Sequence, residues 1–282
     1  MYNYEELYRD QIRTILSNGK WIYNERTGTR CLTIPRYVAE YNLDPKTPPL
    51  LNGRPSYPVS AVAEIIGYLR RYEWANQFAS IGSNTWSVNA NETQAWLDNK
   101  NRKGHDHVGQ IYGAAVGEEH IRKVLDNLSK GIDDRGLVLN WWIPDKFDKG
   151  CLRPCMNQHQ FAIVGNELHV TSTQRSTDMM CGKNYNSNQV YFLGMLGAHL
   201  AGKDGGTGLH IMNHLHIYED HLNGVEEYLA RKIAYVDAEF KIADWVRTAA
   251  DIMDSHEHAR EYFSIEGYKG TAQPKIDFKL IA

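Results

Sequence analysis

Residues 159–173, HQFAIVGNELHVTST, carry the pattern that decides the central part of the fold. Strand-forming residues alternate with polar ones on both sides of Gly165-Asn166, a pair that favours a tight turn. We therefore predict an antiparallel hairpin with strands at 159–164 and 167–173. Because a hairpin brings its two open ends together, Cys155 before the first strand and Arg175 after the second are expected to be neighbours.

Helical patterns surround this hairpin. Residues 190–201 are apolar nearly all round, as expected for a central helix that is buried on every side. Apolar residues at a spacing of three to four predict another helix from residue 59 to 69, with Glu64 inside it. The sequence also predicts an opening helix that carries Leu7, Ile12, Ile15 and Leu16 and ends near residue 18, and helices at 121–128, 223–233 and 237–254. It predicts strands at 31–34, 137–139, 210–218 and 274–281, and a polar surface excursion at 83–110. No repeat or linker divides these elements, so we expect one α+β domain over residues 1–282.

Composition limits the classes of partner. Apolar residues make up 42% of the chain, which is ample for a sizeable core, and the net charge of −3 leaves no broad basic field for a nucleic acid. The apolar stretch at 190–201 is shorter than the about 20 residues of a membrane span. The first residues lack the basic flank and apolar core of a signal peptide. We expect a cytoplasmic protein whose four cysteines stay reduced, with no nucleic-acid or membrane partner.

Reactive residues gather in three nearby segments, PCMN at 154–157, QRSTD at 174–178 and GKNYN at 182–186. A cysteine after a proline is weak evidence alone, since most free cysteines are small core residues. The predicted hairpin adds a second observation, because it places Arg175 near Cys155. A neighbouring guanidinium favours the thiolate, which is the nucleophilic form of cysteine. Cys155 is therefore the candidate nucleophile.

These segments belong to an ordered series of motifs along the chain. The series is RTGT at 26–29, AEIIGYL at 63–69, Trp86, GQIYG at 109–113, DDR at 133–135, PC at 154–155, QRSTD at 174–178, Gly182 with Asn186, and HIYEDH at 216–221. In this order and spacing the set resembles the thymidylate synthase superfamily, which includes thymidylate synthases and phage-type deoxypyrimidine nucleotide hydroxymethylases. The resemblance covers most of the chain. It implies a large mixed sheet packed with helices, a sheet-to-sheet homodimer, and 5,10-methylenetetrahydrofolate as cofactor.

The resemblance implies catalytic roles for four residues. Cys155 would add to C6 of a pyrimidine and so make C5 a carbon nucleophile. Glu64 would order water and relay protons at the base, and Tyr112 would assist removal of the C5 proton. Arg175 would hold the 5′-phosphate beside the nucleophile through its planar, multi-donor fork.

Substrate and cofactor contacts follow from the same resemblance. Besides Arg175, the nucleotide would be bound by Arg26 and Ser176 at the phosphate, by Gln174, by His216 and Tyr218 at the sugar 3′-hydroxyl, and by Arg135 from the neighbouring subunit. The folate would be bound by Trp86, by Asp178 at its pterin ring, and by Gly182.

Asn186 bears on the choice of base. A carboxamide can donate to O4 and accept from N3–H of uracil, which a carboxylate cannot do. Cytosine-specific members of the superfamily resemble this segment but carry Asp at the position of Asn186. The residue therefore favours dUMP over dCMP.

Several positions depart from the pattern of ordinary thymidylate synthases. Met156 stands where they have His, Gly136 where they have a second Arg, and Asn89 where they have a second Trp. Their Pro-Phe-Asn becomes Asn184-Tyr185-Asn186, and nearby apolar positions become Ser187 and Asn188. Polar groups beside the reacting carbon should admit water. With Cys-x-Asn at 155–157, these changes favour a dUMP hydroxymethylase.

Three other functions remain open. The first is a thymidylate synthase, which makes dTMP and dihydrofolate; the second is a catalytically inactive relative that only binds nucleotide; and the third is a flavin-dependent variant. Four histidines at 210, 214, 216 and 221 raise the question of zinc. Since neither paired cysteines nor an HExxH helix accompanies them, we predict no metal site.

Overall fold

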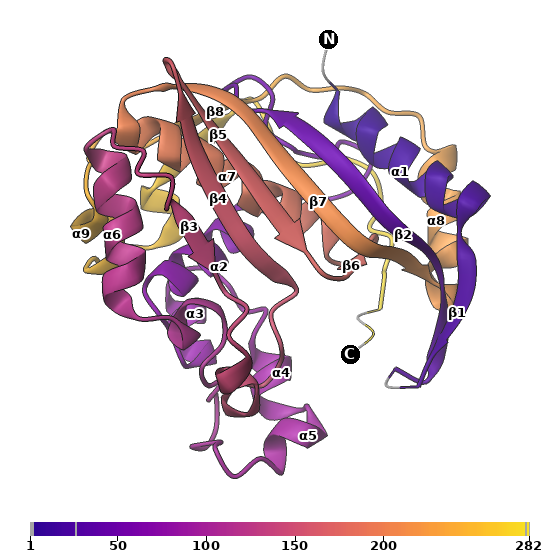
Figure 1. The fold of residues 1–282 in the computed structure, drawn as a ribbon. Helices are drawn as coiled ribbons and strands as arrows, with labels where there is room; N and C mark the ends of the chain where they lie inside the picture. Colours follow the sequence, from indigo (N-terminus) through magenta and orange to yellow (C-terminus); the bar gives the residue numbers. More distant parts are fainter. Residues whose placement is uncertain (1–2, 26, 280, 282) are drawn as a thin grey trace.

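A mixed sheet organises the chain, for which a computed structural model describes residues 3–25, 27–279 and 281. The sheet contains β1 (Lys20–Asn24), β2 (Thr29–Asn42), β3 (Val138–Asn140), β4 (Met156–Val164), β5 (Glu167–Gln174), β6 (Thr177–Asp178) and β7 (Asp204–Tyr218). The order within these residues is β1-β2-β7-β5-β4-β3, with β6 also paired to β7 (Figure 1). β5 and β6 run parallel to β7, whereas the other neighbours are antiparallel. The predicted α+β class is confirmed.

The β4–β5 hairpin forms as predicted. Val164 pairs with Glu167 across a turn in which Gly165 has a φ of 63°, a left-handed conformation that glycine adopts without steric cost. At the open end, the Arg175 backbone N–H donates to the Cys155 carbonyl at 2.9 Å. The hairpin therefore joins the two residues that the sequence analysis expected to be neighbours.

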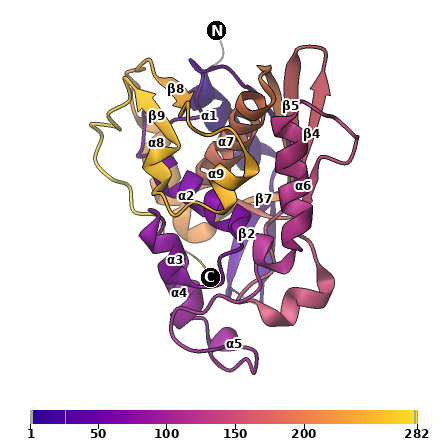
Figure 2. The same cartoon turned by 90° about the vertical axis from the view of Figure 1, so that its left-hand side faces the viewer.

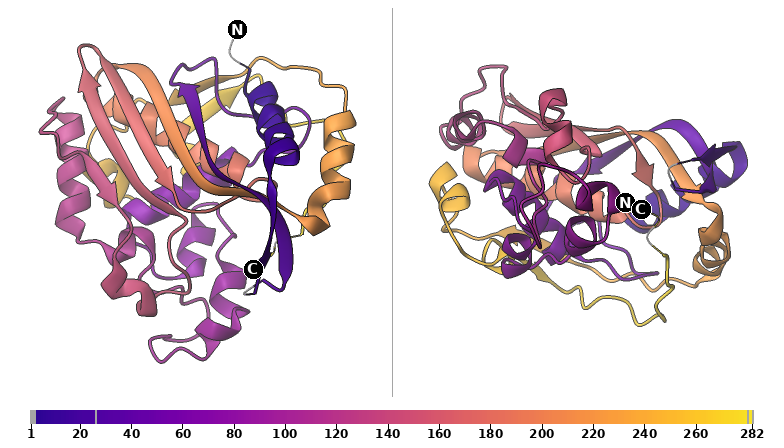
Figure 3. Two further views of the ribbon diagram at one scale, coloured as in Figure 1. Left: turned by 45° about the vertical axis from the view of Figure 1, so that its right-hand side comes forward. Right: turned by 90° about the horizontal axis from the view of Figure 1, so that it is seen from below.

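Helices lie against one face of the sheet and beyond its lower edge in Figure 1. They are α1 (Tyr4–Asn18), α2 (Pro58–Leu69), α3 (Ala75–Ser80), α4 (Ser87–Asn91), α5 (Gln94–Leu97), α6 (Glu118–Ser129), α7 (Lys183–Ala201), α8 (Leu222–Ala230) and α9 (Ala249–Met253), with short 3-10 helices η1 (Tyr112–Ala115), η2 (Pro144–Lys149), η3 (Glu219–His221) and η4 (Ala259–Glu261). Figures 2 and 3 show α2 and α7 stacked behind the sheet, and α7 contacts both β5 and β7. None of the described helices is both long and apolar enough to cross a membrane.

The two faces of the sheet differ in exposure. Along β5, Leu168, Val170 and Ser172 are buried under the helices, whereas the alternate residues Thr171 and Thr173 are half-exposed. This is the period of two that a strand requires when one face packs on a core. The opposite face is the one turned to the viewer in Figure 1.

Two helical predictions are confirmed and extended. In α6, the predicted stripe of Ile121, Val124, Leu125 and Leu128 is buried. The central helix α7 begins at Lys183 rather than Val190, because its first turns, although polar, are buried and hydrogen-bonded. The Ser187 hydroxyl donates to the Lys183 carbonyl at 2.8 Å, for example. This extension places Asn186 on a helix most of whose residues are buried.

The polar excursion at 83–110 contains the short helices α4 and α5, held by the buried rings of Trp86 and Trp96. Two other predictions were wrong. The helix expected at 237–254 is replaced by strand β8 (Glu239–Ile242), paired with β9 (Phe263–Glu266), and the short α9, because Phe240 and Ile242 bury with a period of two. No described residue of the tail at 274–281 lies in a strand.

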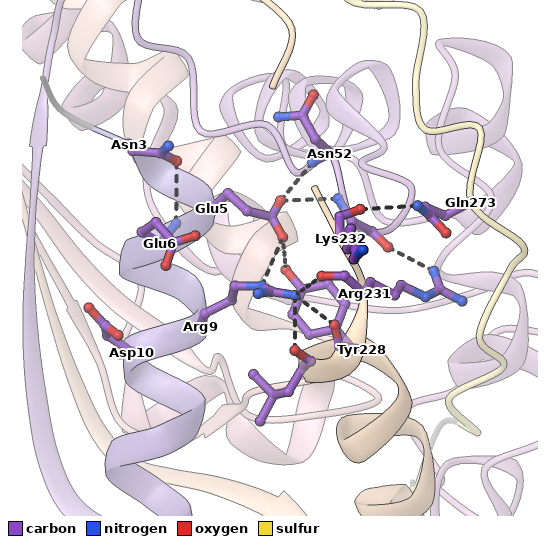
Figure 4. Close-up of polar contacts among 12 residues, drawn as sticks. Asn3, Glu5, Glu6, Arg9, Asp10, Asn52, Tyr228, Arg231, Lys232 and Gln273 are labelled. Carbon is purple, nitrogen blue, oxygen red and sulfur yellow. Dashed lines mark hydrogen bonds and ion pairs between the residues drawn. The ribbon is translucent and has the colours of Figure 1, made fainter. Parts of the chain in front are cut away.

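A buried ion pair ties α1 to α8 and to the loop after β2 (Figure 4). Glu5 accepts the backbone N–H groups of Asn52 at 2.7 Å and Gly53 at 3.1 Å. Arg9 Nη2 donates to three carbonyl oxygens at the end of α8, those of Tyr228, Leu229 and Arg231. Glu5 and Arg9 are both buried and lie 3.7 Å apart, so each is the counter-charge of the other.

Replacing Arg9 by Ala is expected to lower the free energy of unfolding by about 3–5 kcal/mol, because it leaves Glu5 as a buried, uncompensated charge and three carbonyls without their donor. Urea denaturation measures the change. Arg13→Ala on the same helix is the matched control, since its pair with Asp10 is exposed and should be worth less than about 1 kcal/mol. Equal losses in the two variants would contradict the assigned role of Arg9.

Lys183 is a fully buried lysine at the start of α7. Its Nζ lies 4.6 Å from the ring centroid of Tyr4 and 5.5 Å from that of Tyr41, and donates to the Tyr4 hydroxyl at 3.3 Å. Burial lowers the pKa of Lys183 well below its ordinary value of 10.5. The aromatic faces stabilise the ammonium only in part.

Replacing Lys183 by Met is expected to stabilise the protein most at neutral pH and least at alkaline pH. The unfolded lysine keeps its proton up to about pH 10.5, whereas the folded one releases it earlier, so the stability of the wild type rises with pH in between, by at most about 1.4 kcal/mol per pH unit. Urea denaturation of both proteins at about pH 7, 8.5 and 10 tests this. A difference in unfolding free energy that does not change with pH would contradict it.

Candidate active site

Cys155 lies half-buried immediately before β4, next to Arg175 at the end of β5. Nη2 of Arg175 lies 3.9 Å from the Cys155 sulfur. The guanidinium is held there by the carbonyls of Pro154 at 2.9 Å and Arg153 at 3.0 Å, and by the ring of Trp142, 5.7 Å away. A positive group fixed beside the sulfur favours its nucleophilic thiolate form.

Tyr112 lies on the other side of Cys155. Its hydroxyl oxygen accepts the backbone N–H of Cys155 at 3.0 Å. The Tyr112 ring stacks on Tyr68 with 4.1 Å between centroids, and Trp86 packs edge-on against both rings. Burial raises the pKa of Tyr112 well above 10, so the hydroxyl keeps its proton at neutral pH.

Glu64 is buried in α2, and its carboxylate accepts hydrogen bonds from four surrounding side chains. Its carboxylate accepts hydrogen bonds from Thr85 at 2.6 Å, from Gln189 and Tyr185 at 3.2 Å each, and from Tyr68. Burial raises the pKa of Glu64, and the four hydrogen bonds oppose that shift. A carboxyl group whose pKa is raised toward neutrality can exchange protons with a substrate or water.

Sequence reasoning missed the four partners of Glu64. Tyr68 was detectable, since it lies four residues after Glu64 on one helix face. Thr85, Tyr185 and Gln189 reach Glu64 from other elements, so no local spacing in the sequence predicts these contacts.

Asn186 and Gln174 share a hydrogen bond. Gln174 Nε2 donates to Asn186 Oδ1 at 3.0 Å, and Asn186 Nδ2 donates to Gln189 Oε1 at 2.9 Å. Each of the two polar atoms of Asn186 thus has one protein partner. A carboxamide has two donor hydrogens and two acceptor lone pairs, so one of each is left for a ligand.

The residues expected to hold the sugar and phosphate lie near the ends of β6 and β7. Asp178 pairs with His216 across these strands. The His216 ring contacts Tyr218 edge-on at 4.9 Å, and burial lowers the pKa of His216, so the imidazole is neutral at neutral pH. Ser176 is half-buried between β5 and β6. Arg26 lies outside the described residues.

Arg135 is not brought to this cluster. It lies on the exposed loop between α6 and β3, where the neighbouring Asp133 accepts the backbone N–H of Ile163 at 2.9 Å. Ile163 is at the opposite end of β4 from Cys155. At a rise of about 3.3 Å per residue, the two ends of this strand are roughly 25 Å apart.

A cavity of about 280 Å³ lies next to Gly182, one of the residues expected to bind the folate. The backbone N–H of Cys181, which lines it, donates to Asp178 Oδ1 at 3.1 Å, and Gly182 follows as the cap of α7. The other lining side chains are Arg54, Pro55, Tyr57, Lys275, Ile276, Asp277 and Phe278. Its aromatic side chains and the Arg54 guanidinium suit a cofactor that carries aromatic rings and carboxylates, so these residues fit a folate, whereas Lys275 is paired with Asp277 at 3.2 Å.

The polar residues expected to admit water are buried or half-buried, and two of them have partners within the protein. Ser187 is fully buried and hydrogen-bonds Tyr41 at 3.0 Å, and Asn188 is buried and donates to the carbonyls of Pro49 and Asn184. Met156 is buried in the core, and Asn89 is half-buried in α4. Two of the changes that favoured a hydroxymethylase are therefore structural substitutions in α7.

One possible metal-ligand group occurs in the part of the chain that the structure describes. Asp178, Cys181 and His221 place their ligand atoms within 4.8 Å of one another. Of the four clustered histidines only His221 belongs to it, and its Nε2 bonds the Lys279 carbonyl at 2.8 Å. Burial raises the pKa of Cys181, which therefore stays a thiol. The absence of a metal site in this protein therefore stays a prediction.

Known proteins resemble the chain over nearly its whole length. The family model described as thymidylate synthase matches residues 6–282. A thymidylate synthase of Shewanella pealeana is 41% identical over 87% of this chain and 90% of its own length. Those of Haemophilus influenzae and Aliivibrio fischeri are each 39% identical over 97% of this chain and 99% of their own length. With Cys155 set beside Arg175 on the expected mixed sheet, the chain belongs to the thymidylate synthase family, whose enzymes transfer a one-carbon unit from 5,10-methylenetetrahydrofolate to C5 of a pyrimidine nucleotide.

Proposed function

We propose that this protein is a thymidylate synthase that converts dUMP into dTMP and releases dihydrofolate. The observation that carries the proposal is the Cys155 sulfur 3.9 Å from the Arg175 guanidinium, in a chain about 40% identical to proteins named thymidylate synthase. Asn186 supports uracil as the base. The burial of Ser187 and Asn188 removes two arguments for water at the reacting carbon.

The proposed reaction begins at Cys155. Its sulfur forms a bond to C6 of uracil, and the electron pair of the C5–C6 double bond moves toward O4, where an N–H of Asn186 stabilises the developing charge. The cofactor supplies the one-carbon unit that C5 attacks and the hydride that completes the methyl group. The C5 proton leaves toward water held by Glu64, and the protonated Tyr112 hydroxyl assists by hydrogen-bonding that water. The Cys155 thiolate then departs as the double bond re-forms.

A hydroxymethylase is the second candidate, because Asn89 occupies a position on α4 where ordinary synthases carry a second tryptophan. A smaller polar side chain there leaves less apolar surface to exclude water. Water would then add to the reacting carbon in place of hydride, so the product would be hydroxymethyl-dUMP and the folate would stay unoxidised.

One assay separates the two candidates. The protein is incubated with dUMP and methylenetetrahydrofolate, dihydrofolate is followed by its absorbance, and the nucleotide is weighed by mass spectrometry. A methylated nucleotide formed together with dihydrofolate is the expected result. A hydroxymethylated nucleotide without dihydrofolate would replace the proposal by the second candidate, and no product from dUMP would overturn both.

We further propose that residues 1–282 act as one catalytic domain in a homodimer that pairs the open sheet faces. The support is Arg135, which lies too far from its own Cys155 to share a nucleotide with it and suits the phosphate site of a second subunit. Mixing inactive Arg135→Ala and Cys155→Ala proteins should then restore activity, because one hybrid site has both residues intact. No restoration after verified subunit exchange would contradict the arrangement.

A further inference from the structure

A continuous line of side-chain hydrogen bonds crosses the protein from β2 to α2 and passes through Asn186. Five successive contacts, each between 2.8 and 3.2 Å, make up this line. All its members except Asn186 are buried. In order, they are Tyr41, His210, Gln174, Asn186, Gln189 and Glu64.

The orientation of Gln189 is fixed at the Glu64 end. Its Nε2 donates to the Glu64 carboxylate at 3.2 Å and to the Ala61 carbonyl at 3.4 Å. A backbone carbonyl can only accept, so the amide nitrogen must face this side. The Gln189 oxygen is therefore turned toward Asn186, and the atom that Asn186 presents to it must be the nitrogen.

The orientation of Gln174 is fixed at the other end. Its Nε2 donates to the Ser176 carbonyl and to Asn186 Oδ1, both at 3.0 Å, which leaves Oε1 facing His210 Nε2 at 2.8 Å. Burial lowers the pKa of His210 well below 6.5, so the ring is neutral and carries one N–H. That hydrogen must be on Nε2, and Nδ1 must accept from the Tyr41 hydroxyl at 3.1 Å.

The fixed amides of Gln189 and Gln174 hold the side-chain amide of Asn186 in one orientation. Turning its amide over would place oxygen against the Gln189 oxygen and nitrogen against the Gln174 nitrogen, which loses both bonds. Uracil offers an acceptor at O4 and a donor at N3, whereas cytosine offers the reverse pair. An amide free to turn could serve either base, but an amide held in one direction cannot.

We infer that preference for uracil over cytosine is set by this directional line rather than by Asn186 alone, with His210 and Gln189 as its positioning residues. The inference rests on the proposed function, in that it takes dUMP as the substrate. His210 acts because its N–H is the donor to a buried glutamine oxygen. Without it, Gln174 keeps its Nε2 bonds to the Ser176 carbonyl and Asn186, but its buried Oε1 loses its donor, and a buried acceptor left unpaired reorganises or admits water.

The test measures dissociation constants for dUMP directly and for dCMP by competition, in the absence of folate. His210→Phe keeps a ring but removes the donor, whereas His210→Gln keeps an N–H near the position of Nε2. His210→Phe is expected to lower the dUMP preference about tenfold, and His210→Gln to restore most of it. His199→Phe is the matched control, since His199 bonds the Val246 carbonyl at the far end of α7 and should leave the preference unchanged.

Gln189→Met keeps the size of the side chain, removes both polar atoms and tests the same line from its other end. It should lower the preference to a similar degree, so the inference stays testable if a His210 variant does not fold. A merely structural role would reduce the fraction of folded protein without changing the ratio of the two constants. An unchanged ratio in a folded His210→Phe or Gln189→Met protein would overturn the inference. A wild type that does not prefer dUMP would instead overturn the proposed substrate.

Discussion

Replacing Cys155 by alanine is expected to lower kcat with dUMP by roughly 10⁴-fold or more, because no other group can form the bond to C6. Arg175, Tyr112 and Glu64 remain in place in this variant, so dUMP should still bind with an affinity close to that of the wild type. The measurements are the initial rate of nucleotide conversion and the dissociation constant for dUMP. Mass spectrometry of the denatured wild type after incubation with dUMP and cofactor should also find a nucleotide adduct on Cys155.

Cys151→Ala is the matched control for this prediction. Cys151 lies four residues earlier, but burial raises its pKa to about 12, so its thiol is not ionised at neutral pH. Its loss should change kcat by no more than a few-fold. Nearly unchanged activity in Cys155→Ala would remove the enzyme function proposed for this site and leave a nucleotide-binding relative.

The sequence predicted correctly those helices and turns whose structure is specified by neighbouring residues. The stripe of α6 and the turn at Gly165 specify their own structures, so the helix and the hairpin were predicted correctly. Phe240 and Ile242 fit a helix as well as a strand, and only pairing with β9 decides between them. The tail at 274–281 alternates as a strand does, but no described residue of it pairs with a strand.

The site divides in the same way. Cys155 and Arg175 were predicted to be neighbours because one hairpin joins them, whereas their family roles came from resemblance. His210 shows what sequence alone could not provide. It was noted as one of four clustered histidines that raised the question of zinc, yet its neighbours in space are Tyr41 from β2 and Gln174 from β5. Contacts between distant segments decide its protonation state and its partners.

Replacing Asn186 by aspartate is expected to lower kcat/KM for dUMP by about 10³-fold or more. A carboxylate cannot donate to O4 of uracil, and a site that loses a hydrogen bond on which recognition depends discriminates strongly. The surroundings add to the loss, because the Gln189 oxygen at 2.9 Å would then face a carboxylate oxygen and is held there by Ala61. The measurement is kcat/KM for dUMP and dCMP in the same protein.

Asn188→Asp separates this effect from the general cost of a new charge in α7. Asn188 is buried two residues from Asn186, and its amide donates to the carbonyls of Pro49 and Asn184 rather than to the line through Gln174. This control should lose stability but keep the ratio of kcat/KM for dUMP to that for dCMP. Asn186→Asp should lower that ratio at least 10²-fold, because a carboxylate can still accept from the amino group of cytosine. Equal ratios in the two variants would show that the charge, and not the direction of the Asn186 amide, decides the base.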